Sequence, residues 1–409
     1  EVDAVGPSAD RPLAGVPIVV KEEYDVTGDV TTLGGAGNST PRTADSEVVR
    51  RLRAAGAVIV GRTTMPEFGQ FPFTESVATG VTRNPFDLDR SPGGSSGGSA
   101  VAVATGMVPV ALGADGGGSI RIPASACGLV GLKPTRGCIS VAPLSQHWYG
   151  LVVLGGMSRS VRDSALLLDV ISGSTPVDRW SVPPPREPFA AVAAREPGTL
   201  RIAWSTKCVT PGVDTDPEIT AATEQVARAL VRLGHRVHRT APRWPVATDA
   251  FLPQFYGGMA AEAGQVEHPE RLEPRTRQTA RLARWATPRV VERAIRRGER
   301  VAAAVDARLL TDADVFLLPT MPKLPPPVGL LDGMDAVRAQ VATLPYVANT
   351  VLTNVSGHPA LALPAGLSAS GLPIGVQLIA RRGEEGLLLA IAAQIEASRP
   401  DFWPGVATP

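Results

Sequence analysis

The sequence predicts an α/β fold in which a largely parallel β-sheet is covered by helices. Two stretches show the strand–helix–strand order that builds such sheets. In the first, residues 46–56 carry an apolar helical face and are followed by a strand-like run at 57–60. In the second, a strand at 200–205 precedes a helix at 217–233, and a further strand begins at Val237.

Length and composition exclude several classes of function. The 409 residues are 44% hydrophobic and 19% charged, as in a soluble globular enzyme, and they allow either several average domains or one large α/β unit. The formal net charge of +1 provides no basic field for nucleic acid or an anionic membrane surface. The longest apolar run, 100–114, is too short and too interrupted by glycine to span a bilayer. We therefore expect neither nucleic acid nor a membrane as a partner.

Cysteine usage indicates a reducing compartment. Cys127, Cys138 and Cys208 are odd in number and lack the spacing of a metal site. We expect all three to be reduced and mostly buried as small apolar side chains, and the protein to be cytoplasmic. No metal or other cofactor is expected.

The first predicted strand, 16–20, ends directly before Lys21. Only four of the 40 basic residues are lysines, so this chain uses arginine wherever a fixed surface charge is enough. A guanidinium cannot lose its proton in a protein, whereas a desolvated ammonium can. Lys21 is therefore a candidate for proton transfer, although a strand-end lysine that reaches solvent is the ordinary alternative.

The next predicted elements are a helix and an aromatic loop. Ser46 is a candidate N-cap for the helix at 46–56, and Gly56 is its stop. The loop at 65–76 carries three phenylalanines, for which core packing is the ordinary interpretation. A second aromatic loop at 142–150 contains His147, and a lone histidine in such a loop is more often structural than catalytic.

The second half of the chain alternates connections with regular elements. An amphipathic helix is expected at 159–173, and the proline-rich stretch 174–197 is expected to be a connection outside the core. Residues 241–306 are rich in arginine and helical in composition, which is compatible with a cap over a pocket or with core packing. A buried strand is expected at 313–319, and Pro217 marks the first turn of its helix.

The most informative stretch is 92–137, which contains the serine clusters GGSSGGS at 93–99 and GGGSIR at 116–121. A flexible linker is excluded by the small apolar residues between the clusters, which suit a buried helix and strand. A phosphate-binding loop is weakly supported, because neither a Gly-Lys-Ser/Thr ending nor a G-x-G-x-x-G after a strand is present. The remaining interpretation is glycine used for backbone freedom beside serines that perform chemistry.

This stretch resembles the amidase signature hydrolases. The resemblance rests on the 24-residue spacing of Ser95 and Ser119, the D-x-G-G-S-I-R core at 115–121 and the C-G-L-V-G-L-K-P-T run at 127–135. It extends over nearly the whole chain and is strongest at 11–173 and 345–398. It implies one domain, 1–409, with a single large mixed, mostly parallel sheet surrounded by helices. It also implies that a helical segment that usually precedes the first strand is missing here.

The resemblance assigns a Ser-cisSer-Lys triad. It implies that Ser119 is the nucleophile, that Ser95 relays its proton to Lys21 as the general base, and that the Gly94–Ser95 peptide bond is cis. The backbone N–H groups of Gly116, Gly117, Gly118 and Ser119 would form an oxyanion hole. We expect Lys21 to be uncharged in the resting enzyme. A Ser-His-Asp triad through His147 or His358 is the weaker alternative, and no G-x-S-x-G elbow is present.

Supporting and substrate-binding residues follow from the same resemblance. Gly94 leaves room at the cis bond, Ser96 provides hydrogen bonds, and Asp115 and Arg121 are expected to hold the glycine turn as an ion pair. Gly116 departs from the family, which often has threonine or isoleucine there. The expected substrate-binding residues are Phe68, Gly69, Gln70, Phe71, Trp148 and Tyr149.

The predicted function is hydrolysis of carboxylic amides through an acyl-enzyme, on hydrophobic or aryl amides and also on esters or aryl carbamates (urethanes). The expected partner is a small-molecule amide, and the expected state is a monomer or homodimer. A glutamine-hydrolysing subunit of a tRNA-dependent amidotransferase is the alternative. A non-catalytic binding protein on the same scaffold is disfavoured, because all three triad positions carry competent side chains.

Overall fold

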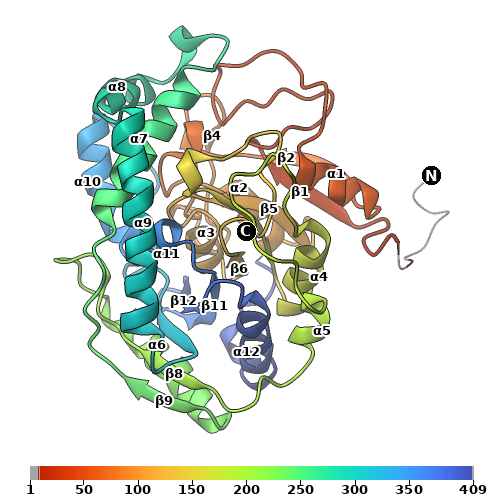
Figure 1. The fold of residues 1–409 in the computed structure, drawn as a ribbon, viewed down its shortest axis with the longest axis vertical. Helices are drawn as coiled ribbons and strands as arrows, with labels where there is room; N and C mark the ends of the chain where they lie inside the picture. Colours follow the sequence, from red (N-terminus) through yellow and green to blue (C-terminus); the bar gives the residue numbers. More distant parts are fainter. Residues whose placement is uncertain (1–7, 9, 408–409) are drawn as a thin grey trace.

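The fold is built on one ten-stranded sheet (Figure 1). The computed structural model describes residues 8 and 10–407. From one edge to the other the strands are β2 (Val58–Thr63), β1 (Pro17–Lys21), β5 (Val110–Asp115), β7 (Val153–Ser158), β6 (Val130–Lys133), β11 (Ala360–Leu367), β12 (Pro373–Ile379), β10 (Val315–Pro319), β8 (Arg201–Trp204) and β9 (Arg236–Arg239). A short hairpin of β3 (Glu75–Ser76) and β4 (Gly80–Val81) stands apart from it.

The sheet is mixed, and its parallel pairs lie at the two edges. The two predicted strand–helix–strand units form these edges: β1 pairs in parallel with β2 and β5, and β8 pairs in parallel with β9 and β10. Between them, the pairs from β5 through β7, β6, β11 and β12 to β10 are antiparallel. The predicted large mixed sheet surrounded by helices is confirmed.

Alternating side chains along the strands bury both faces of the sheet. Ile18 and Val20 of β1 belong to one apolar core, and Val19 between them belongs to another. One core includes side chains of α4 (Val161–Ile171) and α12 (Glu385–Ser398). The other includes those of α2 (Gly97–Ala104) and α3 (Arg121–Ala126), the two short helices that follow the serine clusters. Each serine cluster thus lies at the start of a helix that packs against this face of the sheet.

The remaining helices begin and end near the predicted positions. Ser46 is the N-cap residue of α1 (Glu47–Ala54), as predicted, but its hydroxyl makes no capping hydrogen bond. Pro217 starts α6 (Pro217–Arg232) as expected. The proline-rich connection contains only the short α5 (Phe189–Ala193).

A group of helices lies at one side of the sheet, on the left in Figure 1. It contains α7 (Thr248–Ala263), α8 (Pro274–Leu282), α9 (Pro288–Leu309), α10 (Ala336–Val347) and α11 (Val351–Ser356). The first three correspond to the arginine-rich region. In α7 the aromatic side chains Phe251 and Phe255 stack on each other, with ring centroids 5.7 Å apart.

The three cysteines are unpaired and buried, as their spacing predicts. Among the helices that the structure describes, none is both long and apolar enough to cross a membrane.

Candidate active site

Strand β1 ends in Lys21, whose side chain contacts Ser95, the serine expected to relay the proton. The Lys21 Nζ atom donates to Ser95 Oγ at 2.8 Å, and both residues are buried, with exposed fractions of 1% and 2%. The Gly94–Ser95 peptide bond is cis. A Cβ at Gly94 would lie 2.8 Å from the Phe73 backbone nitrogen, so only glycine fits there. Lysine and serine, 74 residues apart in sequence, therefore meet in a site that excludes bulk water.

Glu23 also contacts this lysine, and the sequence interpretation missed it. Its Oε1 atom lies 3.0 Å from Lys21 Nζ, and the side chain is 8% exposed. This oxygen accepts no hydrogen bond within the described part of the chain, so its contact with Lys21 is one of charge. The carboxylate thus places a negative charge beside the buried amine of Lys21.

Ser119 lies in the turn between β5 and α3 and is partly exposed. The turn is fastened to the segment that carries Ser95 at two points. The Ser96 N–H donates to the Ser119 carbonyl at 3.2 Å, and Ser96 Oγ exchanges hydrogen bonds of 3.3 Å with the Ala114 backbone. The three residues assigned to the triad are thus brought into one region.

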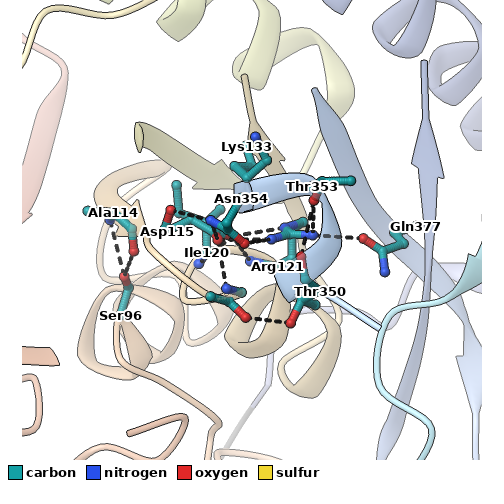
Figure 2. A network of polar contacts seen from close by, with 12 residues as sticks. Ser96, Ala114, Asp115, Ile120, Arg121, Lys133, Thr350, Thr353, Asn354 and Gln377 are labelled. Atoms are coloured by element: carbon teal, nitrogen blue, oxygen red, sulfur yellow. Dashed lines mark hydrogen bonds and ion pairs between the residues drawn. The ribbon is translucent and has the colours of Figure 1, made fainter. Parts of the chain in front are cut away.

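A buried ion pair holds the glycine turn (Figure 2). Asp115 and Arg121 are both fully buried, and Arg121 Nε and Nη2 each donate to the Asp115 carboxylate at 2.9 Å. The carboxylate also accepts from the Gly118 and Ile120 N–H groups at 2.7 and 3.2 Å. Burial raises the pKa of Asp115, but the charge and hydrogen bonds of Arg121 outweigh this effect and lower it to about 2.

Side chains from distant parts of the chain complete the network. Asn354 of α11 donates to the Asp115 carboxylate at 2.8 Å and accepts from Arg121 at 2.7 Å. Thr353 and Gln377 also accept from Arg121. Lys133 is buried beside them, and burial followed by the charge of Arg121 lowers its pKa to about 7. The network ties the turn to α11 and β12.

One of the four expected oxyanion-hole donors has another partner. The Gly118 N–H donates to Asp115, which removes it from the set and corrects the sequence-based assignment. Gly118 is a structural glycine instead: its φ is +129°, and a Cβ there would lie 2.4 Å from Thr350 Oγ1. At Gly116 a Cβ would lie 2.9 Å from Val152 and 3.1 Å from Trp148. The donors left for an oxyanion are the N–H groups of Gly116, Gly117 and Ser119.

The expected substrate-binding residues have different surroundings. Phe68 and Phe71 are buried in apolar clusters, and the Gln70 side chain is hydrogen-bonded to Thr276 and Thr279 of α8, which gives it a structural partner instead of a substrate. Gly69 lies beside the relay serine, since a Cβ there would be 3.0 Å from Ser95 Oγ.

Two of these residues belong to the second aromatic loop. Trp148 is buried against Phe255, with ring centroids 5.2 Å apart, and its Nε1 donates to Glu262 of α7. Tyr149 is partly exposed and packs near Gly257. Among the expected substrate-binding residues, Gly69 and Tyr149 are thus the two whose positions are compatible with contact to a substrate.

Two apolar residues beside the turn escaped the sequence analysis as pocket residues. The nearest atoms to a Cβ at Gly117 would be those of Phe251 at 3.5 Å and Val351 at 3.8 Å, and both side chains are partly exposed. They come from α7 and α11, so their position depends on long-range packing. They provide an apolar wall next to Ser119.

The histidines occupy other networks. His147 Nε2 lies 2.8 Å from Glu262 Oε1. Burial lowers the pKa of His147, but the hydrogen bond and charge of Glu262 outweigh it and raise this pKa. His358 contacts Ser356 and Asp306, and burial lowers its pKa to about 4. Within the described residues neither histidine bonds to Ser95 or Ser119, so the geometry does not support a Ser-His-Asp triad.

Comparisons with known proteins agree with this arrangement. A family model described as Amidase matches residues 3–389. AmiB2 of Mycobacterium tuberculosis (strain ATCC 25618 / H37Rv) is 47% identical over 391 residues, which cover 95% of this chain and 83% of that protein. The chain belongs to the amidase family. The predicted family and enzyme class, a hydrolase of amide C–N bonds, are confirmed.

Solved structures of this amidase family share the fold. The structure of 6-aminohexanoate cyclic dimer hydrolase has a TM-score of 0.91 and 38% identity, covering 97% of this chain and 87% of the other. A bacterial aryl acylamidase of the amidase signature enzymes has a TM-score of 0.82 and 27% identity, covering 94% of this chain and 82% of the other.

Among the residues that the structure describes, no group of three or more histidine, cysteine or acidic residues could hold a metal ion.

Proposed function

We propose that this amidase cleaves carboxylic amides through an acyl-enzyme on Ser119, with Ser95 as proton relay and Lys21 as general base. The observation that carries the proposal is the buried 2.8 Å hydrogen bond from Lys21 Nζ to Ser95 Oγ, beside a turn that ends in a partly exposed serine. A serine hydroxyl becomes a useful nucleophile only when a neighbouring group accepts its proton.

In the first half-reaction, Ser119 Oγ attacks the amide carbonyl carbon while its proton passes to Ser95, whose own proton passes to Lys21. The resulting oxyanion accepts hydrogen bonds from the N–H groups of Gly116, Gly117 and Ser119. Collapse of this intermediate breaks the C–N bond, and the proton returns by the same route to the leaving amine. Water then hydrolyses the ester of Ser119 by the same sequence of steps, which releases the acid.

Apolar side chains beside the turn support hydrophobic or aryl amides as substrates. Phe251 and Val351 offer apolar contact to a group bound at Ser119, and Tyr149 adds a partly exposed ring. Similarity to a cyclic-dimer hydrolase and to an aryl acylamidase supports the same class. Esters and aryl carbamates present a similar carbonyl and belong in the same substrate panel.

The test uses release of nitroaniline from an anilide. Ser119→Ala and Lys21→Ala are each expected to reduce the rate by about 10²–10⁴ or more, as removal of a nucleophile or general base does. Ser145→Ala and Lys207→Ala, at exposed positions, are matched controls. A variant of Ser119 or Lys21 with the wild-type rate would refute the mechanism.

The alternative is a glutamine-hydrolysing subunit of a tRNA-dependent amidotransferase. The apolar wall at Gly117 favours an apolar acyl group over the polar side chain of glutamine. The purified chain is therefore expected to hydrolyse simple amides without stimulation by tRNA. Glutamine hydrolysis that depends on partner subunits and tRNA would establish the alternative.

The expected oligomeric state, a monomer or a homodimer, is tested by size-exclusion chromatography with light scattering.

A further inference from the structure

We infer that Glu23 is a positioning residue for the catalytic base, because its carboxylate holds Lys21 against Ser95 and stabilises the ammonium that forms when Lys21 accepts the proton. This inference rests on the proposed function, since it takes Lys21 to be the base. It extends the triad by a buried carboxylate from the segment that directly follows β1.

The position of Glu23 is fixed by its neighbours in sequence. The Tyr24 N–H donates to the Lys21 carbonyl at 3.1 Å, which closes a turn around Glu23. Arg62 of β2 donates to the carbonyls of both Glu22 and Tyr24 at 2.9 Å. Tyr24 is anchored in turn, because its hydroxyl donates to the Gly113 carbonyl of β5 at 2.6 Å. The backbone on both sides of Glu23 is thus bound to the sheet.

Lys21 is the cation that contacts Glu23, because the other charged groups around Glu23 pair with one another. Glu23 lines a cavity of about 130 Å³ together with Asp25, Arg42, His147 and Glu262. The two other carboxylates among these lining residues each have a partner of their own. Asp25 lies 3.0 Å from Arg42, and Glu262 lies 2.8 Å from His147. Glu23 Oε1 lies 3.0 Å from Lys21 Nζ and forms no hydrogen bond within the described chain.

This arrangement can do two things for the base. Lys21 Nζ lies between a hydroxyl at 2.8 Å and a carboxylate oxygen at 3.0 Å, so its side chain is held from two sides. When Ser119 loses its proton through Ser95, the ammonium appears in a site that excludes water, where an adjacent negative charge is strongly stabilising. A buried carboxylate beside the general base serves the same end in serine hydrolases that use histidine.

The decisive experiment is the pH dependence of kcat and kcat/KM for Glu23→Gln on an anilide. Loss of the carboxylate charge makes Lys21 give up its proton more easily, so the acid limb is expected to move to lower pH. The maximal kcat is expected to fall by about tenfold or more, up to the roughly 10⁴-fold that the corresponding carboxylate contributes in a Ser-His-Asp triad. A merely structural role would lower the rate without moving the limb.

Control variants separate the groups that titrate in this region. Glu22→Gln removes the adjacent carboxylate, which instead accepts from Thr32 at 2.9 Å, and is expected to keep the wild-type profile. His147→Gln tests the titratable group across the cavity, and its acid limb is expected to remain in place. Asp25 and Glu262 keep their own partners, Arg42 and His147, in Glu23→Gln. Tyr24, whose pKa is raised by burial and by the charge of Glu23, titrates on the alkaline side and does not set the acid limb.

The outcomes distinguish this inference from the mechanism on which it rests. If Lys21→Ala abolishes activity but Glu23→Gln has the wild-type kcat and limb, the inference fails and the mechanism stands. If Lys21→Ala is fully active, both fail. Should Glu23→Gln not fold, Glu23→Asp decides, because its shorter side chain withdraws the carboxylate from the 3.0 Å contact with Lys21 Nζ. A lower kcat together with an acid limb at lower pH supports the role, whereas a wild-type kcat, or a lower kcat with an unmoved limb, overturns it.

Discussion

Replacement of Asp115 by asparagine tests whether the buried ion pair holds the catalytic turn. Asparagine has the shape of aspartate but no charge, so Arg121 would remain buried without its counter-ion. Breaking a buried pair in this way costs about 3–5 kcal/mol, because the remaining charge is uncompensated. Asparagine would also turn an N–H₂ group toward donors that now share the carboxylate, including the Gly118 N–H at 2.7 Å. We expect a large fall in the stability of the variant at pH 7.

The lowered pKa of Asp115 adds a pH signature. The folded protein holds this pKa at about 2 against an ordinary value of 3.8, so the unfolded chain binds the proton more readily. The stabilisation is therefore present above about pH 4 and is lost as the pH falls toward 2. The difference between the folded and unfolded pKa of Asp115 corresponds to about 2 kcal/mol of unfolding free energy. By pH 3, which is still about one unit above the folded pKa, the gap in unfolding free energy between wild type and Asp115→Asn should narrow by about half of that, about 1 kcal/mol.

The assay is urea denaturation followed by tryptophan fluorescence at a series of pH values from 7 to 3, with midpoints compared between proteins. Asp401→Asn is the matched control, because Asp401 pairs with Arg399 at an exposed position and such pairs contribute about 0–1 kcal/mol. Equal midpoints for wild type and Asp115→Asn at pH 7 would refute the reasoning. A gap that stays constant down to pH 3 would refute its electrostatic part.

Four further single substitutions test positions in or near the turn. Burial of Lys133, then the charge of Arg121, lowers its pKa to about 7, so the unfolded chain binds more protons between about pH 7 and 10. Wild-type stability relative to Lys133→Met should therefore rise with pH in that range, and a flat difference in urea midpoints would contradict this. Gly118→Ala should unfold at lower urea and lose most of its activity, because its Cβ would lie 2.4 Å from Thr350 Oγ1. Gly117→Ala, with nothing closer than 3.5 Å, should stay folded and lose activity mainly for large acyl groups. Phe251→Ala should raise KM for aryl amides more than for acetamide, and equal effects on the two substrates would remove Phe251 from the pocket.

Local chemistry made much of the fold predictable from the sequence. Apolar runs with helical or strand periodicity predicted the two strand–helix–strand units, which the structure places at the two edges of the sheet. Pro217 marked the start of α6. The antiparallel centre was less accessible, since strand direction there is set by connections of widely different length. The family resemblance, which rests on a long motif, indicated the large mixed sheet and the site residues, and periodicity alone indicates neither.

The candidate site was predictable only where its residues lie in that motif. Lys21, Ser95 and Ser119 are motif residues, and the hydrogen bond between the first two is present in the structure. Asn354 lies 239 residues from Asp115, and no local pattern indicates that its amide would meet that carboxylate. Phe251 lies in the arginine-rich region that was expected to be helical, but its position beside Gly117 depends on how α7 packs against the turn.

The oxyanion turn shows why residue types alone mislead at such a site. Three successive glycines suggest three equivalent N–H donors, and the sequence offers no reason to exclude one of them. The Asp115 carboxylate takes the third, at Gly118, and thereby fixes the turn that presents the others. In the proposed mechanism this use of one donor for structure has a reason, because an oxyanion hole works only when its dipoles are already oriented before the reaction. The same logic applies to the proposed base, Lys21: the motif indicates this lysine, but it does not indicate Glu23, whose inferred role is to hold it.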